Sequence, residues 1–169
     1  MSLPSWLPKL VLYSDHGKDW NSYEEFLYKI FVQDIITSGL CFNGKKVSFY
    51  KEPMYKNKVA TFWHVTSEDF NGNEEDRPPD FRRCERIGWI KAIIENNKDS
   101  NVKVWENERG NSKRTCVWFD SNEDSFIVVL ETKPNFYILK TAYQVEHKNR
   151  KERLEKEYQG YKNINTAKS

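Results

Sequence analysis

Hydrophobic and polar residues recur along the chain with two periods, which together predict a mixture of helices and strands. Apolar residues at helical spacing predict helices over residues 22–38, 80–97 and 148–160. Apolar alternation, or short continuous apolar runs, predicts strands over residues 47–52, 57–66, 102–109, 113–120, 125–132 and 136–145. The last four strands are joined by connections too short for a crossover, so we expect neighbouring strands to be antiparallel. The sequence thus predicts an α+β fold, with helices packed on a curved antiparallel sheet that ends in a four-stranded C-terminal meander.

The last two predicted strands differ in how apolar and polar residues are distributed over their two faces. Residues 126–130 form a continuous apolar run, which is typical of a central strand covered on both faces. In the strand over residues 136–145, both faces begin apolar and become more polar, as expected where a strand leaves a core and enters a cleft. A solvated strand end is the alternative. Alternation assigns one face to Tyr137, Leu139, Thr141, Tyr143 and Val145, and the other to Phe136, Ile138, Lys140, Ala142 and Gln144.

Two earlier segments contain candidate functional side chains. His64 lies within the strand predicted over residues 57–66, either as a half-buried histidine bound to the main chain or as a general acid and base. In the predicted helix 80–97, Arg82, Arg86 and Trp89 share a face. Two guanidinium groups on one face repel each other, so either nearby acids or a bound phosphate should offset the repulsion.

Composition places the chain among globular proteins with a polar surface. The formal net charge of +2 is too small to indicate a protein that binds a long nucleic-acid duplex. Cys41, Cys84 and Cys116 form no CxxC pair, so we expect reduced thiols in a cytoplasmic protein and no metal site. The sequence shows neither a signal peptide nor an apolar run of membrane-spanning length, so no membrane association is expected.

We divide the single domain, residues 1–169, into four parts. They are an N-terminal arm (1–20), a helix and first strand (22–56), a core (57–160) and a frayed tail (161–169). Trp6 and Trp20 are expected to hold the arm against the body. Residues 68–76 contain five acids and no basic residue, and they form either a solvated loop or a weak cation site. The spacing of a calcium-binding loop is absent from them.

Two motifs resemble a known family. The Lys140-Thr-Ala-Tyr143 end of the last strand, followed by a charged helix, resembles the last core strand of the barnase–EndoU–colicin–RelE superfamily of small RNases, especially its phage-borne members. The run Arg82-Arg-x-x-Arg-Ile-x-Trp-Ile90 is similar to a segment that phage-type members have before their central strands. The resemblance covers about residues 57–158 and implies that residues 57–160 form an RNase-like core.

The resemblance implies a toxin-like, metal-independent endoribonuclease that cleaves RNA by attack of the 2′-hydroxyl on the adjacent phosphorus. It implies His64 as the acid or base, Arg86 as the residue that holds the phosphate, and Thr141 with Tyr143 as groups that position the phosphate or exchange a second proton. Lys140 faces the other way by alternation, so either Lys140 or the pair of Thr141 and Tyr143 lines the cleft, unless the strand contains a β-bulge. The further substrate-binding residues are Arg82, Trp89, Lys140 and Arg150.

The implied partners are RNA, as tRNA, mRNA or ribosome, and an inhibitor or antitoxin protein. Neither a cofactor nor a metal is implied. A non-catalytic module that binds RNA or protein on the same scaffold is the alternative. A metal-dependent hydrolase that uses the acidic loop is a third hypothesis, disfavoured because the loop lacks a metal-binding pattern.

Overall fold

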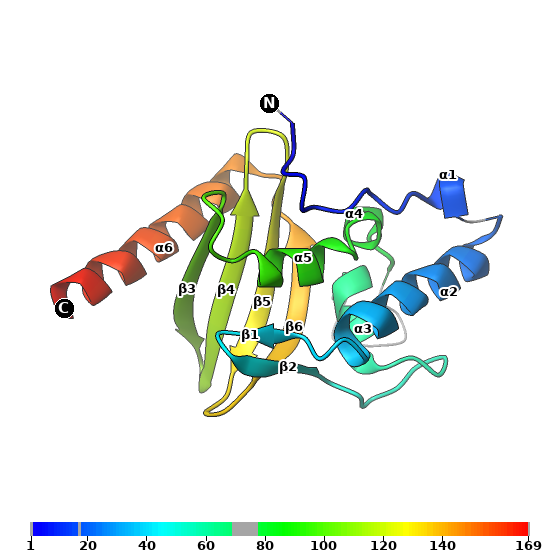
Figure 1. The fold of residues 1–169 in the computed structure, drawn as a ribbon, viewed down its shortest axis with the longest axis horizontal. Coiled ribbons are helices and arrows are strands. Elements are labelled where there is room, and N and C mark those ends of the chain that lie inside the picture. Colours follow the sequence, from blue (N-terminus) through cyan, green and yellow to red (C-terminus); the bar gives the residue numbers. More distant parts are fainter. Residues whose placement is uncertain (1, 17, 69–77, 169) are drawn as a thin grey trace.

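The computed structural model describes residues 2–16, 18–68 and 78–168, and its centre is one curled six-stranded sheet (Figure 1). The strand order is β1-β2-β6-β5-β4-β3. β2 runs parallel to β6 and the other neighbours are antiparallel. The predicted α+β class and C-terminal meander are thus confirmed, within a mixed sheet. The strands are β1 (Cys41–Phe42), β2 (Lys45–Phe49), β3 (Val102–Arg109), β4 (Ser112–Asp120), β5 (Ser125–Thr132) and β6 (Tyr137–Gln144).

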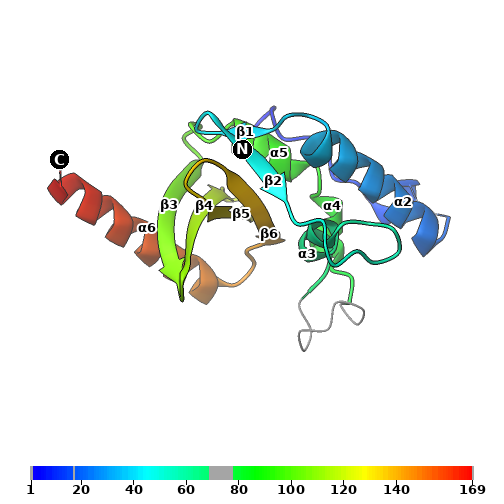
Figure 2. The same ribbon diagram turned by 90° about the horizontal axis from the view of Figure 1, so that it is seen from below.

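The helices lie on two sides of the sheet, and α6 projects away from the body toward the C-terminus (Figures 1 and 2). The long N-terminal helix begins at Trp20, because Asp19 caps it by accepting a 2.8 Å hydrogen bond from the Ser22 N–H. The tail predicted to be frayed is helical as far as Lys168. The helices are α1 (Tyr13–His16), α2 (Trp20–Phe31), the π-helix η1 (Val32–Ile36), α3 (Ala60–Thr66), α4 (Phe81–Glu85), α5 (Trp89–Glu95) and α6 (Lys148–Lys168).

Each face of the sheet has its own hydrophobic core. The larger core joins the sheet to the N-terminal helices and includes Phe126, Val128 and Leu130 from alternate positions of β5. The residues between them, Ile127 and Val129, belong to a smaller core beneath α6. Every residue of β5 from 125 to 130 is buried, which confirms the central strand predicted there. The smaller core consists of Trp105, Cys116, Trp118, Ile127, Val129, Val145 and Leu154.

The N-terminal arm is fixed along the body, as the position of Trp6 predicts. The Trp6 indole donates a 3.0 Å hydrogen bond to Asp99 and its ring packs edge-on against Phe119. Further along the arm, the carbonyl of Pro8 accepts a 2.9 Å hydrogen bond from the Trp89 indole. A Cβ at Gly88 would lie 3.2 Å from the Pro8 ring, so glycine allows the arm to approach the start of α5 this closely.

Two predicted elements are wrong in kind or extent. The strand predicted over residues 57–66 is the helix α3, although its aromatic and β-branched composition is typical of strands. Tertiary packing determines the outcome, because the buried residues of α3 follow helical spacing and the helix packs beside β6. The helix predicted over residues 80–97 divides into α4 and α5, with residues 86–88 leaving regular helical structure.

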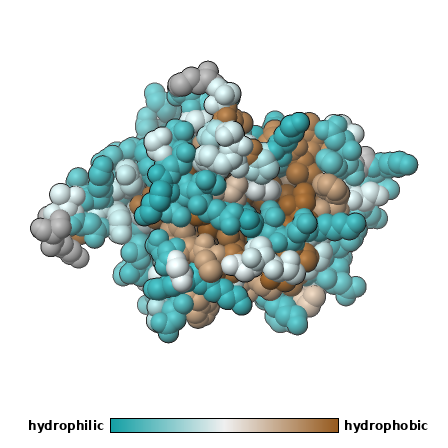
Figure 3. All heavy atoms as spheres, viewed as in Figure 1, coloured by the Kyte–Doolittle hydropathy of each residue, from teal (hydrophilic) through white to brown (hydrophobic). Residues whose placement is uncertain are grey.

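The surface mixes hydrophilic and hydrophobic residues. In the face shown in Figure 3, hydrophilic residues surround hydrophobic ones that gather near its middle. Among the described residues, none of the helices combines the length and the apolar character that a membrane span requires.

The packing of α6 leads to a stability prediction. Leu154 is the most deeply buried α6 side chain among residues 148–166, with 4% of its surface exposed. We expect Leu154→Ala to lower the free energy of unfolding by about 2–5 kcal/mol, because it leaves a cavity in the smaller core. Ile164→Ala is the matched control on the same helix, where the side chain is 57% exposed, and should change stability by less than about 0.5 kcal/mol. Urea unfolding followed by circular dichroism measures both, and equal effects would show that α6 is not anchored at Leu154.

Candidate functional site

The candidate site begins at a β-bulge in β6. Val129 pairs with Thr141 while the next residue of β5, Leu130, pairs with Leu139, so Lys140 is the extra residue. The extra residue shifts the alternation by one position. Before it, Tyr137 and Leu139 face the larger core; after it, Ala142 takes that face. The prediction that Tyr137, Leu139, Thr141, Tyr143 and Val145 share one face is therefore wrong: Thr141, Tyr143 and Val145 turn toward the α6 side.

Two adjoining cavities lie beside this part of β6, and we call them the Tyr143 cavities. The larger, of about 450 Å³, lies where β6 leads into α6. The smaller, of about 150 Å³, lies between α6 and the sheet. Both are lined by Tyr143, Arg150 and Arg153. The larger is completed by Arg83, Gln144, Val145, Glu146, His147 and Asn149, and the smaller by Asn107, Arg109, Arg114, Cys116, Ile127, Val129, Thr141, Leu154 and Glu157.

The lining of the Tyr143 cavities is strongly basic. It contains five arginines against two glutamates, Glu146 and Glu157. Two of the arginines are paired with acids: Arg109 lies 3.9 Å from Glu157, and Arg83 Nε lies 3.2 Å from Asp80. Guanidinium groups present planar sets of N–H donors that match the oxygens of phosphate and carboxylate. A chain with a net charge of only +2 thus concentrates positive charge at one place, which favours the binding of an anion.

Two of these guanidinium groups converge on the phenol of Tyr143. The Arg150 Nη2 donates a 2.5 Å hydrogen bond to the Tyr143 hydroxyl. The central guanidinium carbons of Arg83 and Arg150 lie 5.5 and 5.2 Å from the centre of the Tyr143 ring. Cations at this distance are attracted by the electron-rich face of an aromatic ring. Arg150 is thereby held at the hydroxyl and Arg83 at the ring, so both guanidinium groups lie beside Tyr143.

Arg83 also connects the cavity to α3 and β6. Its Nη1 donates to the carbonyl oxygens of His64 and Ser67, each at 3.0 Å, and to the Thr141 hydroxyl at 3.3 Å. The Thr141 hydroxyl donates to the same His64 oxygen at 2.9 Å. These carbonyls belong to the last turn of α3 and to its C-cap, where no later helical N–H can reach them. Arg83 and Thr141 therefore satisfy the end of α3 and hold it against the bulged strand.

Arg86 and Trp89 do not have the positions predicted for them. Arg86 Nε and Nη2 donate to Asp124 Oδ2 at 3.0 and 2.7 Å, and both side chains are less than a tenth exposed. The repulsion among the arginines is thus offset by acids, which was one of the two expectations. Trp89 is 1% exposed and belongs to the larger core, so its ring is not presented to solvent for base stacking.

Three further predicted residues lie outside the lining of the Tyr143 cavities. Arg82 is largely exposed on α4 and lies 3.3 Å from Glu85. Lys140, the bulge residue, is half-buried and helps to lower the pKa of Glu131, whose main partners are Tyr50 and Lys133. His64 is half-buried on α3, and its contacts with Arg83 and Thr141 are made by the main-chain oxygen. The structure thus brings Thr141, Tyr143 and Arg150 together, and separates Arg82, Arg86, Trp89 and Lys140 from them.

Several arginines of the cavities were not singled out from the sequence. Arg109 and Arg114 lie on the α6 face because Asn107 pairs with Arg114 and alternation carries that face along both strands. The alternation of Trp105, Asn107 and Arg109 along the strand could have predicted from the sequence that Arg109 lies on the same face as Trp105. No comparable signal existed for Arg83, because the groups that hold it at the cavity, on His64, Ser67 and Thr141, are distant in the sequence.

The cysteine in the smaller cavity is not a candidate nucleophile. Burial raises the pKa of the Cys116 thiol to about 12, and Glu157 adds to the effect. A thiol that stays protonated is unreactive. Among the described residues, no three His, Cys, Asp or Glu side chains are grouped so that they could hold a metal ion. The acidic loop considered as a cation site lies, over residues 69–77, outside the described part of the chain.

Comparison of the chain with protein-family models, with curated proteins and with solved structures finds no match. The function of the site therefore has to be inferred from its geometry and from the resemblance in sequence.

The buried pair of Arg86 and Asp124 predicts a structural role for this arginine. We expect Arg86→Ala to lower the free energy of unfolding by about 3–5 kcal/mol, because Asp124 would stay buried without its cation. The double variant Arg86→Met with Asp124→Asn should recover part of this loss. Arg82→Ala is the matched control and should change stability by less than about 0.5 kcal/mol. Urea unfolding measures all three variants, and a stable Arg86→Ala protein would contradict the assignment.

Proposed function

We propose that the Tyr143 cavities hold a phosphate of RNA and that the protein is a metal-independent, toxin-like endoribonuclease. The observation that supports this most is the convergence of the Arg83 and Arg150 guanidinium groups on the Tyr143 phenol. Arg153 and His147 line the same cavity, so donors surround an open space of about 450 Å³. Positive charge around a proton-exchanging hydroxyl is what phosphate-ester cleavage requires.

In the proposed reaction the 2′-oxygen of a ribose attacks the adjacent phosphorus. The bond from the 2′-oxygen to phosphorus forms and the bond from phosphorus to the 5′-oxygen breaks, leaving a 2′,3′-cyclic phosphate and a 5′-hydroxyl. A base takes the 2′ proton and an acid supplies one to the 5′-oxygen. Arg83 and Arg150 stabilise the negative charge that develops on the phosphorus oxygens.

The proton-exchanging groups in this proposal are the Tyr143 hydroxyl and an imidazole. His147 lines the larger cavity and takes the role that the sequence suggested for His64. Thr141 acts as a positioning residue, because its hydroxyl joins Arg83 to the end of α3. The acid–base role of His64 itself stays a prediction.

RNA is the proposed substrate because it alone contains the internal nucleophile. The helix α6 supports this choice, since its N-terminal part forms a cavity wall and also has the exposed Lys148 close to Arg150 in the sequence. Exposed cations along a helix give the sugar–phosphate chain a path on either side of the cleaved bond. An inhibitor or antitoxin protein belongs to the same proposal, because a ribonuclease in its own cell has to be restrained.

Incubation of the purified protein with end-labelled RNA, tRNA and ribosomes tests the proposal. We expect cleavage that persists in EDTA and leaves a 2′,3′-cyclic phosphate, and no cleavage where the attacking 2′-hydroxyl is replaced by hydrogen. Tyr143→Phe should lower the cleavage rate by about a hundredfold or more, because the ring then lacks the hydroxyl that exchanges a proton. Arg150→Ala should also lower the rate, because one charge-stabilising group is lost.

Arg82→Ala is the matched control, because Arg82 is exposed on α4 and lines neither Tyr143 cavity. It should cleave RNA at the wild-type rate. Binding of RNA without product would favour the non-catalytic RNA-binding module instead. Neither binding nor cleavage of any of the RNAs would contradict both functions.

A further inference from the structure

The two halves of α6 are attached to the sheet in different ways, and Leu154 marks the boundary between them. Leu154 is buried in the smaller core, and one turn before it Arg150 is hydrogen-bonded to Tyr143. The residues after it, 155–168, pass the edge strand β3, and the end of the helix extends beyond the sheet (Figures 1 and 2). We call residues 155–168 the strap.

The strap is attached mainly through partly exposed polar contacts. None of the side chains from 155 to 166 is buried. Lys103 Nζ donates a 2.5 Å hydrogen bond to Glu155, and the Tyr161 hydroxyl donates one of 3.4 Å to Glu106. Partly exposed contacts of this kind contribute little to stability. The strap is therefore held more weakly than the half of α6 that ends at Leu154.

The strap is also a poor helix on its own. Gly160 lies in its interior, where glycine is less favourable than alanine. Packing does not require glycine there, because a Cβ at Gly160 would meet no atom within 4 Å outside its own helix turn. Isolated helices shorter than about 12–15 residues are marginal in water. Detachment of the strap from the sheet therefore leads to its unwinding.

The surface beneath the strap contains polar atoms that the attached helix leaves without partners. Trp105 Nε1, Asn107 Oδ1 and Arg114 Nε are buried and have no hydrogen-bond partner within the described part of the chain. The Trp105 ring packs against Tyr158, and the other two residues line the smaller Tyr143 cavity together with Glu157. A buried polar atom without a partner destabilises the state in which it is buried. The covered surface thus opposes attachment of the strap.

Glu157 brings a negative charge from the strap into the smaller cavity. Its Oε1 accepts a 2.7 Å hydrogen bond from Asn107 Nδ2, and its Oε2 lies 3.9 Å from Arg109 Nη2. Three further arginines line the same cavity. Guanidinium groups bind carboxylates and phosphates through the same N–H donors. An external anion therefore competes with the Glu157 carboxylate for this cavity.

We propose that the strap is autoinhibitory. While it is attached, Glu157 acts as an internal anion and the helix closes the smaller cavity. When the strap detaches, Glu157 leaves and the donors of β3 and β4 become accessible to an external anion. Arg150 stays in place, because Leu154 anchors the adjacent turn. Detachment and the internal anion are properties of this chain alone; that the external anion is a phosphate of RNA rests on the proposed function.

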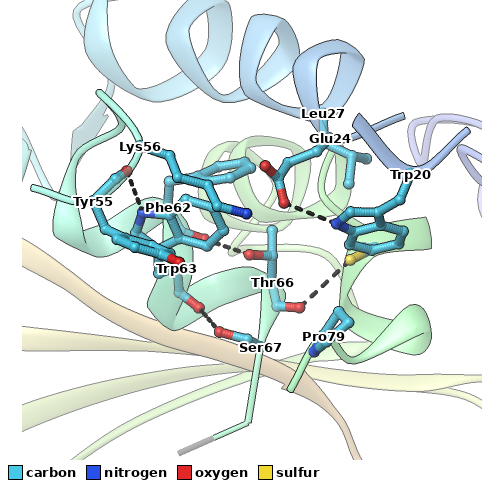
Figure 4. Close-up of a pocket in the computed structure, with 11 residues that line it drawn as sticks. Trp20, Glu24, Leu27, Tyr55, Lys56, Phe62, Trp63, Thr66, Ser67 and Pro79 are labelled. Carbon is cyan, nitrogen blue, oxygen red and sulfur yellow. Dashed lines mark hydrogen bonds between the residues drawn. The ribbon is translucent and has the colours of Figure 1, made fainter. Parts of the chain in front are cut away.

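Two buried cysteines on opposite faces of the sheet allow detachment to be measured. Cys116 lines the smaller cavity beside the strap, whereas Cys84 belongs to the larger core. Cys84 Sγ donates a 3.4 Å hydrogen bond to the Thr66 carbonyl, next to a pocket of about 120 Å³ lined by Trp20 and Trp63 (Figure 4). Burial raises the pKa of both thiols to about 12, so each reacts only when it is uncovered.

Alkylation of the native protein with iodoacetamide tests the detachment. We expect Cys116 to be modified at least about tenfold faster than Cys84, because only the strap has to move, and more slowly than the exposed Cys41. Gly160→Ala should slow the modification of Cys116 about fivefold, because alanine favours the attached helix. Mass spectrometry of the digested protein measures the modification of each cysteine over time.

A pair of glutamate variants separates the strap from the rest of α6. Glu155→Gln weakens the contact with Lys103 and should accelerate the modification of Cys116 about threefold. Glu152→Gln makes the same chemical change on an exposed residue before Leu154 and should leave the rate unchanged.

Calorimetric titration with inorganic phosphate tests the internal anion. Glu157→Gln should bind phosphate at least about tenfold more tightly than the wild type, because the competing charge is lost. The amide oxygen of the variant can still accept the hydrogen bond from Asn107. Glu152→Gln changes the net charge by the same amount and should keep the wild-type affinity for phosphate.

Both experiments are free of RNA, so their outcome does not depend on whether RNA is cleaved. If Cys116 reacts no faster than Cys84, or equally fast in the wild type and in Gly160→Ala, the strap does not detach and the inference is overturned. Equal phosphate affinities of Glu157→Gln and Glu152→Gln, or no binding of phosphate by either, would overturn the role of Glu157 as an internal anion.

Discussion

One inserted residue in β6 determines which side chains of this strand face the larger core and which face α6. Without the bulge at Lys140, the strand would present Tyr137, Leu139, Thr141 and Tyr143 to the same side. With it, the first half of β6 completes the larger core and the second half turns Thr141 and Tyr143 toward α6. A bulge is a common way for a sheet to redirect a side chain next to a functional site.

Arg83 and Arg86 have different structural roles where the helices meet the sheet. Arg86 is neutralised by Asp124, which comes from the turn before β5, so its charge serves to join α4 to the meander. Arg83 satisfies carbonyl groups at the end of α3 and extends to the Tyr143 ring. Their roles differ because α4 ends at Glu85, which turns the two side chains in different directions.

The sequence predicts the meander well because its signals are local. Short turns fix antiparallel neighbours, and a continuous apolar run identifies β5 as central. The sequence-based prediction fails at α3, where aromatic and β-branched residues form a helix. The helix is favoured because its buried side chains pack into the larger core and beside β6. The site was predicted in part: Thr141, Tyr143 and Arg150 meet, while Arg86 and Trp89 are buried elsewhere. A bulge and a helix break have no periodic signal, and both alter which side chains share a face.

The attachment of α6 has a consequence for measurements in salt. Beyond its apolar anchor, this wall of the Tyr143 cavities is joined to the sheet by polar contacts: Lys103 with Glu155, Lys151 with Asp120, and Asn107 with Glu157. Dissolved ions screen exposed pairs of this kind, and they also replace a protein at the phosphates of a polyanion. If the cavities bind a polyanion as proposed, raising the ionic strength loosens the wall and weakens the binding of that ligand at the same time. A count of bound phosphates derived from the steepness of such a titration would exceed the number that the cavities contact.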